Sequence, residues 1–107
     1  MAIPKRLYGP AQLAAAAATV YTVPASRLTV VRNIHIVNAT AADLTFTISI
    51  GADAAATRIF SAQTAAAEDV FDSFAPFVLN AGDVLQAFAS AAASLTITIN
   101  GEEELVA

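Results

Sequence analysis

Apolar and polar side chains alternate along two segments of the chain, residues 44–50 and 94–100. The apolar positions of the first segment are Leu44, Phe46, Ile48 and Ile50, separated by Thr45, Thr47 and Ser49. Those of the second segment are Leu95, Ile97 and Ile99, between Ser94, Thr96, Thr98 and Asn100. Because successive side chains of a strand point to opposite faces, this period of two predicts strands with one buried face and one solvated face.

Shorter runs of the same kind predict further strands, spaced about eight to twelve residues apart. The predicted strands cover residues 19–23, 28–38, 44–50, 57–62, 69–74, 76–79, 84–89 and 95–100, and residues 102–107 form a final edge strand or a tail. We expect residues 84–89 and 95–100 to pair as a hairpin around the small-residue loop 90–94. The pattern predicts an all-β fold, a single β-sandwich or jelly-roll-like domain of about seven or eight short antiparallel strands.

The beginning of the chain has a different character. Residues 1–10 contain two prolines, a glycine and the cations Lys5 and Arg6, a composition that favours an extended arm over a folded element. We therefore divide the chain into an N-terminal arm, residues 1–10, and a β-sandwich domain, residues 11–107. Residues 11–18 are alanine-rich and are compatible with either a short helix or a small-residue strand.

The longest predicted strand, residues 28–38, carries a charge on a face that is otherwise apolar. The side chains expected to share this face are Leu28, Val30, Ile34 and Ile36, and Arg32 interrupts them. A buried charge is costly unless it is paired. Three arrangements stay open for Arg32: a carboxylate partner across the sandwich, a place in an interface, where arginine is enriched, or a twist or bulge that turns the side chain into water.

Composition favours association with other subunits. Hydrophobic residues make up 57% of the 107 residues, but alanine dominates them, and only 13% of the residues are charged. A thin core with few surface charges indicates further burial against other copies, so we expect a homo-oligomer. Cysteine is absent, which excludes disulfides and thiol chemistry. No apolar run approaches the roughly 18 residues that span a bilayer, so we expect no membrane partner.

Charge is distributed unevenly between the two halves of the chain. All five Lys and Arg residues lie within residues 1–58, whereas residues 59–107 carry seven of the nine carboxylates and no cation. If the fold keeps these groups apart, opposite patches favour head-to-tail contacts between copies. If the strands of the two halves interleave, the division has no consequence. Five cations in a net-acidic chain argue against nucleic-acid binding.

No combination of residues in the sequence predicts a reaction. His35 is the only histidine, and one histidine fixes neither a catalytic nor a metal site. No serine lies in a Gly-x-Ser-x-Gly turn, and no glycine-rich phosphate loop is present. Consecutive strand residues alternate between faces, so Glu102, Glu103 and Glu104 cannot all converge on a cation; we interpret them as a solvated edge that resists aggregation. We expect a non-enzymatic protein with no cofactor and no metal.

Two runs of the sequence contain distinctive strand and turn motifs. The first spans Val20–Asn38 and contains the motif Tyr-x-Val-Pro-Ala before a strand that ends in Asn. The second spans Phe77–Leu85 and contains the turn motif Leu-x-Ala-Gly-Asp. Together with the Thr/Ile-rich segment 95–99, these runs resemble small structural proteins of tailed bacteriophages. The resemblance carries no catalytic residues.

The resemblance implies a β-sandwich component of a phage virion, present in many copies on the head or the tail. We expect foremost a capsid decoration (cement) protein that acts as a trimer or other oligomer and stabilises the head lattice. A tail, neck or baseplate accessory subunit is the alternative, and a receptor- or glycan-binding β module is a third possibility. The expected partners are copies of the chain itself and the major capsid or other virion proteins. The expected location is the virion, on the capsid surface or on the tail. The candidate interface residues are Lys5, Arg6, Tyr8, Arg32 and His35.

Overall fold

Nine β-strands and no helix make up residues 2–106, the part of the chain that the computed structural model describes. The strands are β1 (Ala2–Gln12), β2 (Ala18–Thr22), β3 (Arg27–Asn38), β4 (Leu44–Ile50), β5 (Arg58–Ala65), β6 (Asp69–Ser73), β7 (Phe77–Leu79), β8 (Val84–Ala89) and β9 (Leu95–Leu105). The all-β prediction is confirmed, and β4 and β8 have the bounds predicted from the sequence.

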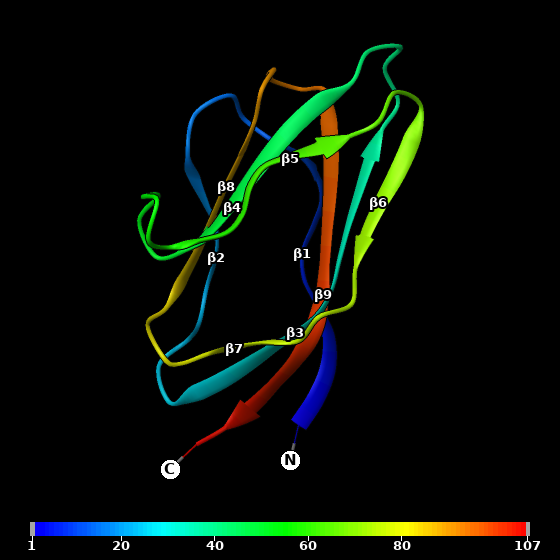
Figure 1. Ribbon diagram of the computed structural model, residues 1–107. Helices are drawn as coiled ribbons and strands as arrows, with labels where there is room; N and C mark the ends of the chain where they lie inside the picture. Colours follow the sequence, from blue (N-terminus) through cyan, green and yellow to red (C-terminus); the bar gives the residue numbers. More distant parts are fainter. Residues whose placement is uncertain (1, 107) are drawn as a thin grey trace.

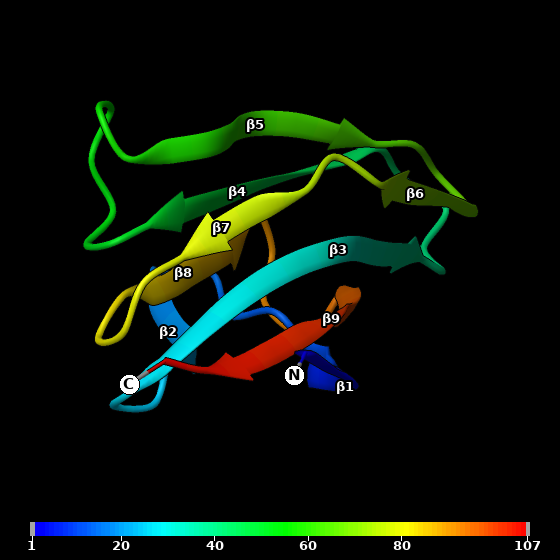
Figure 2. The same ribbon diagram turned by 90° about the horizontal axis from the view of Figure 1, so that it is seen from below.

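The strands form two antiparallel sheets that face each other (Figure 1). Sheet A has the order β1–β9–β3–β6, and β7 also pairs with β3; sheet B has the order β2–β8–β4–β5. Figure 2 shows the two layers, with the chain passing repeatedly from one to the other. This connectivity is that of a jelly roll, so the predicted sandwich class is confirmed.

Apolar side chains from both sheets fill the space between them. On β9 the side chains of Leu95, Ile97 and Ile99 are fully buried, as their alternation predicts. Phe46 on β4 is also buried, and its ring centroid lies 5.0 Å from that of Phe71 on β6. This edge-to-face aromatic contact joins the two sheets, and burial of each large apolar side chain stabilises the fold by about 1.5–3 kcal/mol.

The register of β3 shifts at Arg32. Val31 and Asn33 pair with consecutive residues of β9, which makes Arg32 the extra residue of a β-bulge. The bulge changes which positions face inward. The buried positions are Thr29 and Val31 before the bulge and Ile34 and Ile36 after it. The prediction of one shared face was therefore wrong for Leu28 and Val30, because a bulge inverts the period of two while it turns the arginine into solvent.

The predicted hairpin between residues 84–89 and 95–100 does not form. β8 belongs to sheet B and β9 to sheet A, so the loop 90–94 crosses from one sheet to the other. Both strands bury alternate side chains in the common core: Leu85, Ala87 and Ala89 on β8, and Leu95, Ile97 and Ile99 on β9. Backbone hydrogen bonds hold the crossing: the amide of Ala93 donates to Leu13 and the amide of Ser90 donates to Thr45.

The N-terminal segment differs from the separate arm that we expected. Residues 2–12 are extended, but they form β1, which pairs with β9 along its length and belongs to the sandwich. Gly9 allows this close approach: its φ is +82°, and a Cβ there would lie 2.2 Å from the carbonyl oxygen of Ile97. Residues 13–17 form a loop, neither helix nor strand, and β2 begins at Ala18. Met1 and Ala107 lie outside the described residues.

The three consecutive glutamates do not form the expected edge. β9 continues through them to Leu105, and it lies between β1 and β3 rather than at the border of sheet A. Ala2 pairs with Glu104, so the two ends of the described chain lie side by side (Figure 1). Glu103 points inward and is only 8% exposed, which makes it the one charged side chain in the buried set of the described residues.

Candidate interaction surface

The predicted interface residues lie on two strands of sheet A. Lys5, Arg6 and Tyr8 are on β1, and Arg32 and His35 are on β3. Tyr8 is half-buried and packs against the hydrophobic core, so it contributes to the fold rather than to an open surface. The structure brings Lys5 and Arg32 to one groove, whereas His35 lies further along the sheet with a different set of partners.

Glu103 is the centre of a polar cluster that joins the two sheets. The hydroxyl of Tyr21, on β2 of sheet B, donates to the carboxylate of Glu103 on β9. Lys5 Nζ donates to the other carboxylate oxygen at 3.2 Å. The oxygens of Tyr21 and Thr29 lie 2.9 Å apart and share a further hydrogen bond. A charge-assisted hydrogen bond between the sheets ties β2 to sheet A at one end of the sandwich.

These contacts change the titration of both groups. Hydrogen bonding from Tyr21 holds the pKa of the Glu103 carboxyl below its ordinary value, and Lys5 acts in the same direction. Burial, followed by the hydrogen bond to the Glu103 carboxylate, raises the pKa of Tyr21 to about 12. The ionised carboxylate and the neutral phenol are thus the states that this cluster favours.

The sequence contained a signal for this cluster that we missed. The inward positions of β9 continue past Ile99 to Gly101 and Glu103 with the same odd-numbered period. Extending the alternation into the acidic run would have placed Glu103 inside the sandwich. Its tyrosine partner carried no such signal, because it comes from the other sheet.

A groove of about 690 Å³ opens where β1, β9 and β3 lie side by side. The residues that line it are Pro4, Lys5, Arg32, Asn100, Gly101 and Glu102. Arg32 Nε donates to Glu102 Oε1 at 2.6 Å, and the arginine side chain is 57% exposed. Of the arrangements left open for Arg32, the structure shows the bulge that turns it into water, and its carboxylate partner lies on the adjacent strand rather than across the sandwich. Such an exposed pair adds little stability, about 0–1 kcal/mol.

His35 takes part in a second polar cluster on the outer face of sheet A, the face turned away from sheet B. Its Nδ1 lies 2.7 Å from Oδ1 of Asp72 on β6. Asn33 Nδ2 donates to the same oxygen at 3.3 Å, and Asn100 Nδ2 donates to Asn33 Oδ1 at 3.1 Å. The contacts with His35 and then Asn33 hold the pKa of the Asp72 carboxyl below its ordinary value. The cluster connects the three strands β9, β3 and β6.

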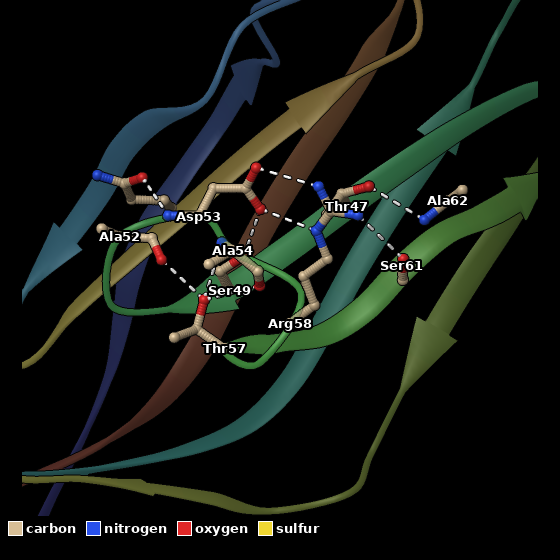
Figure 3. Close-up of polar contacts among 10 residues, drawn as sticks. Thr47, Ser49, Ala52, Asp53, Ala54, Thr57, Arg58, Ser61 and Ala62 are labelled. Carbon is tan, nitrogen blue, oxygen red and sulfur yellow. Dashed lines mark hydrogen bonds and ion pairs between the residues drawn. The ribbon is translucent and has the colours of Figure 1, made fainter.

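A third polar network covers the outer face of sheet B (Figure 3). Arg58 donates to both carboxylate oxygens of Asp53, at 3.0 Å and 3.2 Å, and lowers the pKa of that carboxyl. Ser49 Oγ also donates to Asp53, at 2.9 Å. On the neighbouring stretch, the amide of Ala62 donates to Thr47 Oγ1 at 3.0 Å.

This network explains why the predicted solvated face of β4 is partly covered. Thr47 is 4% exposed and Ser49 is 1% exposed, so both are buried rather than in water. The loop 51–57 brings Asp53 back over β4, and the bulged strand β5 brings the amide of Ala62 above Thr47. The hydroxyl groups of Thr47 and Ser49 lose contact with water but form hydrogen bonds within the protein, which allows these polar groups to be buried.

Residues 2–106 contain no group of three or more His, Cys, Asp or Glu side chains placed to hold a metal ion. The same residues include no helix long and apolar enough to cross a membrane. The expectation of a non-enzymatic protein stays a prediction. What the surface does offer is a set of large exposed apolar side chains: Ile3, Val70, Phe74, Val78, Leu105 and Val106.

Comparison with known proteins finds a similar fold but assigns the chain to no family. No family model matches the chain, and no curated protein matches it. Among solved structures, the chain is similar to a protein of Bacillus endospore appendages, which form a family of disulfide-linked pili. The two chains share 14% sequence identity and a TM-score of 0.60, over 99% of this chain and 89% of that chain. At this identity the likeness shows a shared β-rich fold.

The comparison corrects the expected function. The structural neighbour belongs to a bacterial appendage and not to a phage virion, so the interpretation as a capsid decoration protein was wrong. The motifs that carried the phage resemblance are a strand that stops at a proline and a glycine turn. Both are general devices of short-stranded sandwiches, because they end strands whatever the protein does. With no relative to support it, the virion location stays a prediction.

Proposed function

We propose that this protein is a structural subunit that self-assembles into an appendage-like polymer held together by non-covalent contacts. The observation that carries the proposal is the likeness, over 99% of the chain, to a protein of Bacillus endospore pili. Those pili are disulfide-linked, whereas this chain of 107 residues contains no cysteine. Contacts between its copies would therefore depend on apolar burial and on charge.

The surface of the subunit supports such contacts. A stable interface buries about 800 Å² on each partner, which is roughly 15% of the accessible surface of 5423 Å². A subunit within a polymer uses two interfaces of this kind. Few charges have to be desolvated, because only 13% of the residues are charged, and large apolar side chains such as Phe74 stand exposed.

The test is the mass of the purified chain in solution. Light scattering from about 1 μM to about 1 mM covers contacts of about 4 to 8 kcal/mol, and electron microscopy of the concentrated samples shows the form of any polymer. We expect species that grow with concentration and are unchanged by a reducing agent. A monomer over the whole range would refute the proposal.

A further inference from the structure

One edge of sheet A is positively charged. We call it the β1 edge and define it by Ile3, Lys5 and Arg6, because β1 is the outermost strand on this side (Figure 2). Arg6 forms no ion pair within residues 2–106, and Lys5 pairs with Glu103 while its side chain stays 46% exposed.

The carboxylates beside this edge offset part of the charge of Lys5 but leave Arg6 without an ion pair within residues 2–106. Glu102 is engaged by Arg32, and Glu103 by Lys5 and Tyr21. Glu104 has a partner as well. Arg6 and the exposed part of Lys5 are thus the charges that an approaching molecule meets at the β1 edge.

The opposite edge of sheet A is formed by β6 and, further along β3, by β7, and its β6 part is negatively charged. We call it the β6 edge and define it by Glu68, Asp69, Asp72 and Phe74. Glu68 and Asp69 form no ion pair within the described part of the chain, and Asp72 contacts only His35 and Asn33. No Lys or Arg occurs between residues 59 and 107, so β6 and its flanking loops supply no compensating cation.

The edges of sheet B carry no comparable charge. β2 (Ala18–Thr22) has no charged residue, and the one charge of β5 (Arg58–Ala65) is Arg58, which is paired with Asp53. Part of the uneven charge noted along the sequence therefore survives folding, at the two edges of sheet A, whereas β9 lies between β1 and β3 and two of its glutamates pair with Lys5 and Arg32.

These charges select between possible contacts. Two β1 edges repel each other, and so do two β6 edges, whereas a β1 edge attracts a β6 edge. Pro4 and Pro10 remove two amide donors from β1, so a neighbouring strand cannot form a complete hydrogen-bond ladder there. Side chains must then decide the pairing, and exposed apolar groups are present on both sides: Ile3 is 55% exposed and Phe74 is 73% exposed.

We propose that the β1 edge of one copy docks against the β6 edge of the next copy. The contact uses different surfaces on the two copies, so it does not close into a symmetric dimer but places the A sheets of successive subunits edge to edge in an open polymer. This inference rests on the proposed function, because it names the contact through which the polymer grows.

The test reverses the charge of each edge separately. Arg6→Glu makes the β1 edge of its copy acidic, and Glu68→Arg with Asp69→Arg makes the β6 edge basic. Each variant alone opposes like charges, and we expect the concentration needed for assembly to rise about tenfold or more. Mixed in equal amounts, the two variants offer unlike charges at every contact of an alternating copolymer, so assembly returns. A control, Gln63→Glu with Thr64→Glu on β5, changes the net charge as much as Arg6→Glu but leaves both edges of sheet A unchanged.

The outcomes separate this inference from the proposed function. Loss of assembly in each edge variant and its return in the mixture support the edge contact, since misfolded variants would not rescue each other. Polymers that form equally well from both edge variants, or a mixture that stays unassembled, overturn the edge contact and leave the proposed function standing. A wild-type chain that stays monomeric overturns both.

Discussion

Replacing Glu103 by Gln tests whether a buried charge holds the two sheets together. The change keeps the shape of the side chain and removes its charge. A hydrogen bond to a charged group stabilises a protein by about 1.5–3 kcal/mol and a neutral one by about 0.5–1.5 kcal/mol, so the bond from Tyr21 would lose about 1 kcal/mol. The contact of Lys5, whose side chain is 46% exposed, would lose about 0.5 kcal/mol. We expect the free energy of unfolding at pH 7 to fall by about 1.5 kcal/mol.

The expected change in melting temperature follows from the size of the chain. An unfolding entropy of about 2.1 cal/mol/K per residue gives about 0.22 kcal/mol/K for 107 residues. A loss of about 1.5 kcal/mol therefore lowers Tm by about 7 °C, which circular dichroism measures directly. The matched control is Glu102→Gln, which removes the same charge one residue away. Its partner Arg32 is 57% exposed, so this control should cost at most about 1 kcal/mol.

The pH dependence of Tm for the wild type and Glu103→Gln tests this reasoning. The pKa of Glu103 is lower in the folded chain than its ordinary value of 4.5, so its contribution is present above pH 4.5 and disappears as the pH falls through the lower folded value. The difference in Tm between wild type and Glu103→Gln should thus shrink in acid. An equal difference at pH 7 and in strong acid, or a change at pH 7 no larger than that of Glu102→Gln, would show that the charge does not tie the sheets.

Three further substitutions test other parts of the fold. Phe46→Ala removes the buried ring that contacts Phe71 and should lower the free energy of unfolding by about 3–5 kcal/mol in urea titrations. Gly9→Ala places a Cβ against the backbone of β9 at a left-handed φ and should lower Tm by more than about 4 °C, the equivalent of about 1 kcal/mol. Tyr21 has its pKa raised to about 12, so its contribution is present below pH 10 and is lost as the pH rises through 12. Tyr21→Phe should accordingly be less stable than wild type at pH 8 and should approach it in strong alkali, as thermal melts would show.

The strands could be predicted from the sequence because each obeys a local rule. β4 and the first part of β9 alternate strictly, β2 ends just before Pro24, and the glycine turn around Gly82 separates β7 from β8, so the places of these strands follow from nearby residues alone. The sheet to which each strand belongs does not follow in this way. β8 and β9 have the same pattern whether they pair as a hairpin or face each other across the core, and only the packing of the whole chain decides between the two.

Other features escaped prediction because they depend on a single irregularity or on distant residues. The bulge at Arg32 exchanges the inward and outward positions in the second half of β3. A strict alternation of apolar and polar residues does not predict such an inserted residue. Lys5 and Arg32 were predicted as interface residues and do line one groove. The inward position of Glu103 follows from extending the alternation of β9, whereas its tyrosine partner could not be predicted, because it lies 82 residues away in the sequence and on the other sheet.

The pairing of Ala2 with Glu104 has a consequence for engineering of this chain. Because β1 begins where β9 finishes, a short linker would close the polypeptide into a ring without disturbing either sheet. New ends could then be opened between Ala55 and Ala56, in an exposed loop where cutting breaks no strand. Such a circular permutant would carry its tags on the loop between β4 and β5 of sheet B, whereas residues 2 and 106 flank strands of sheet A, so that one scaffold displays added sequences from either layer of the sandwich.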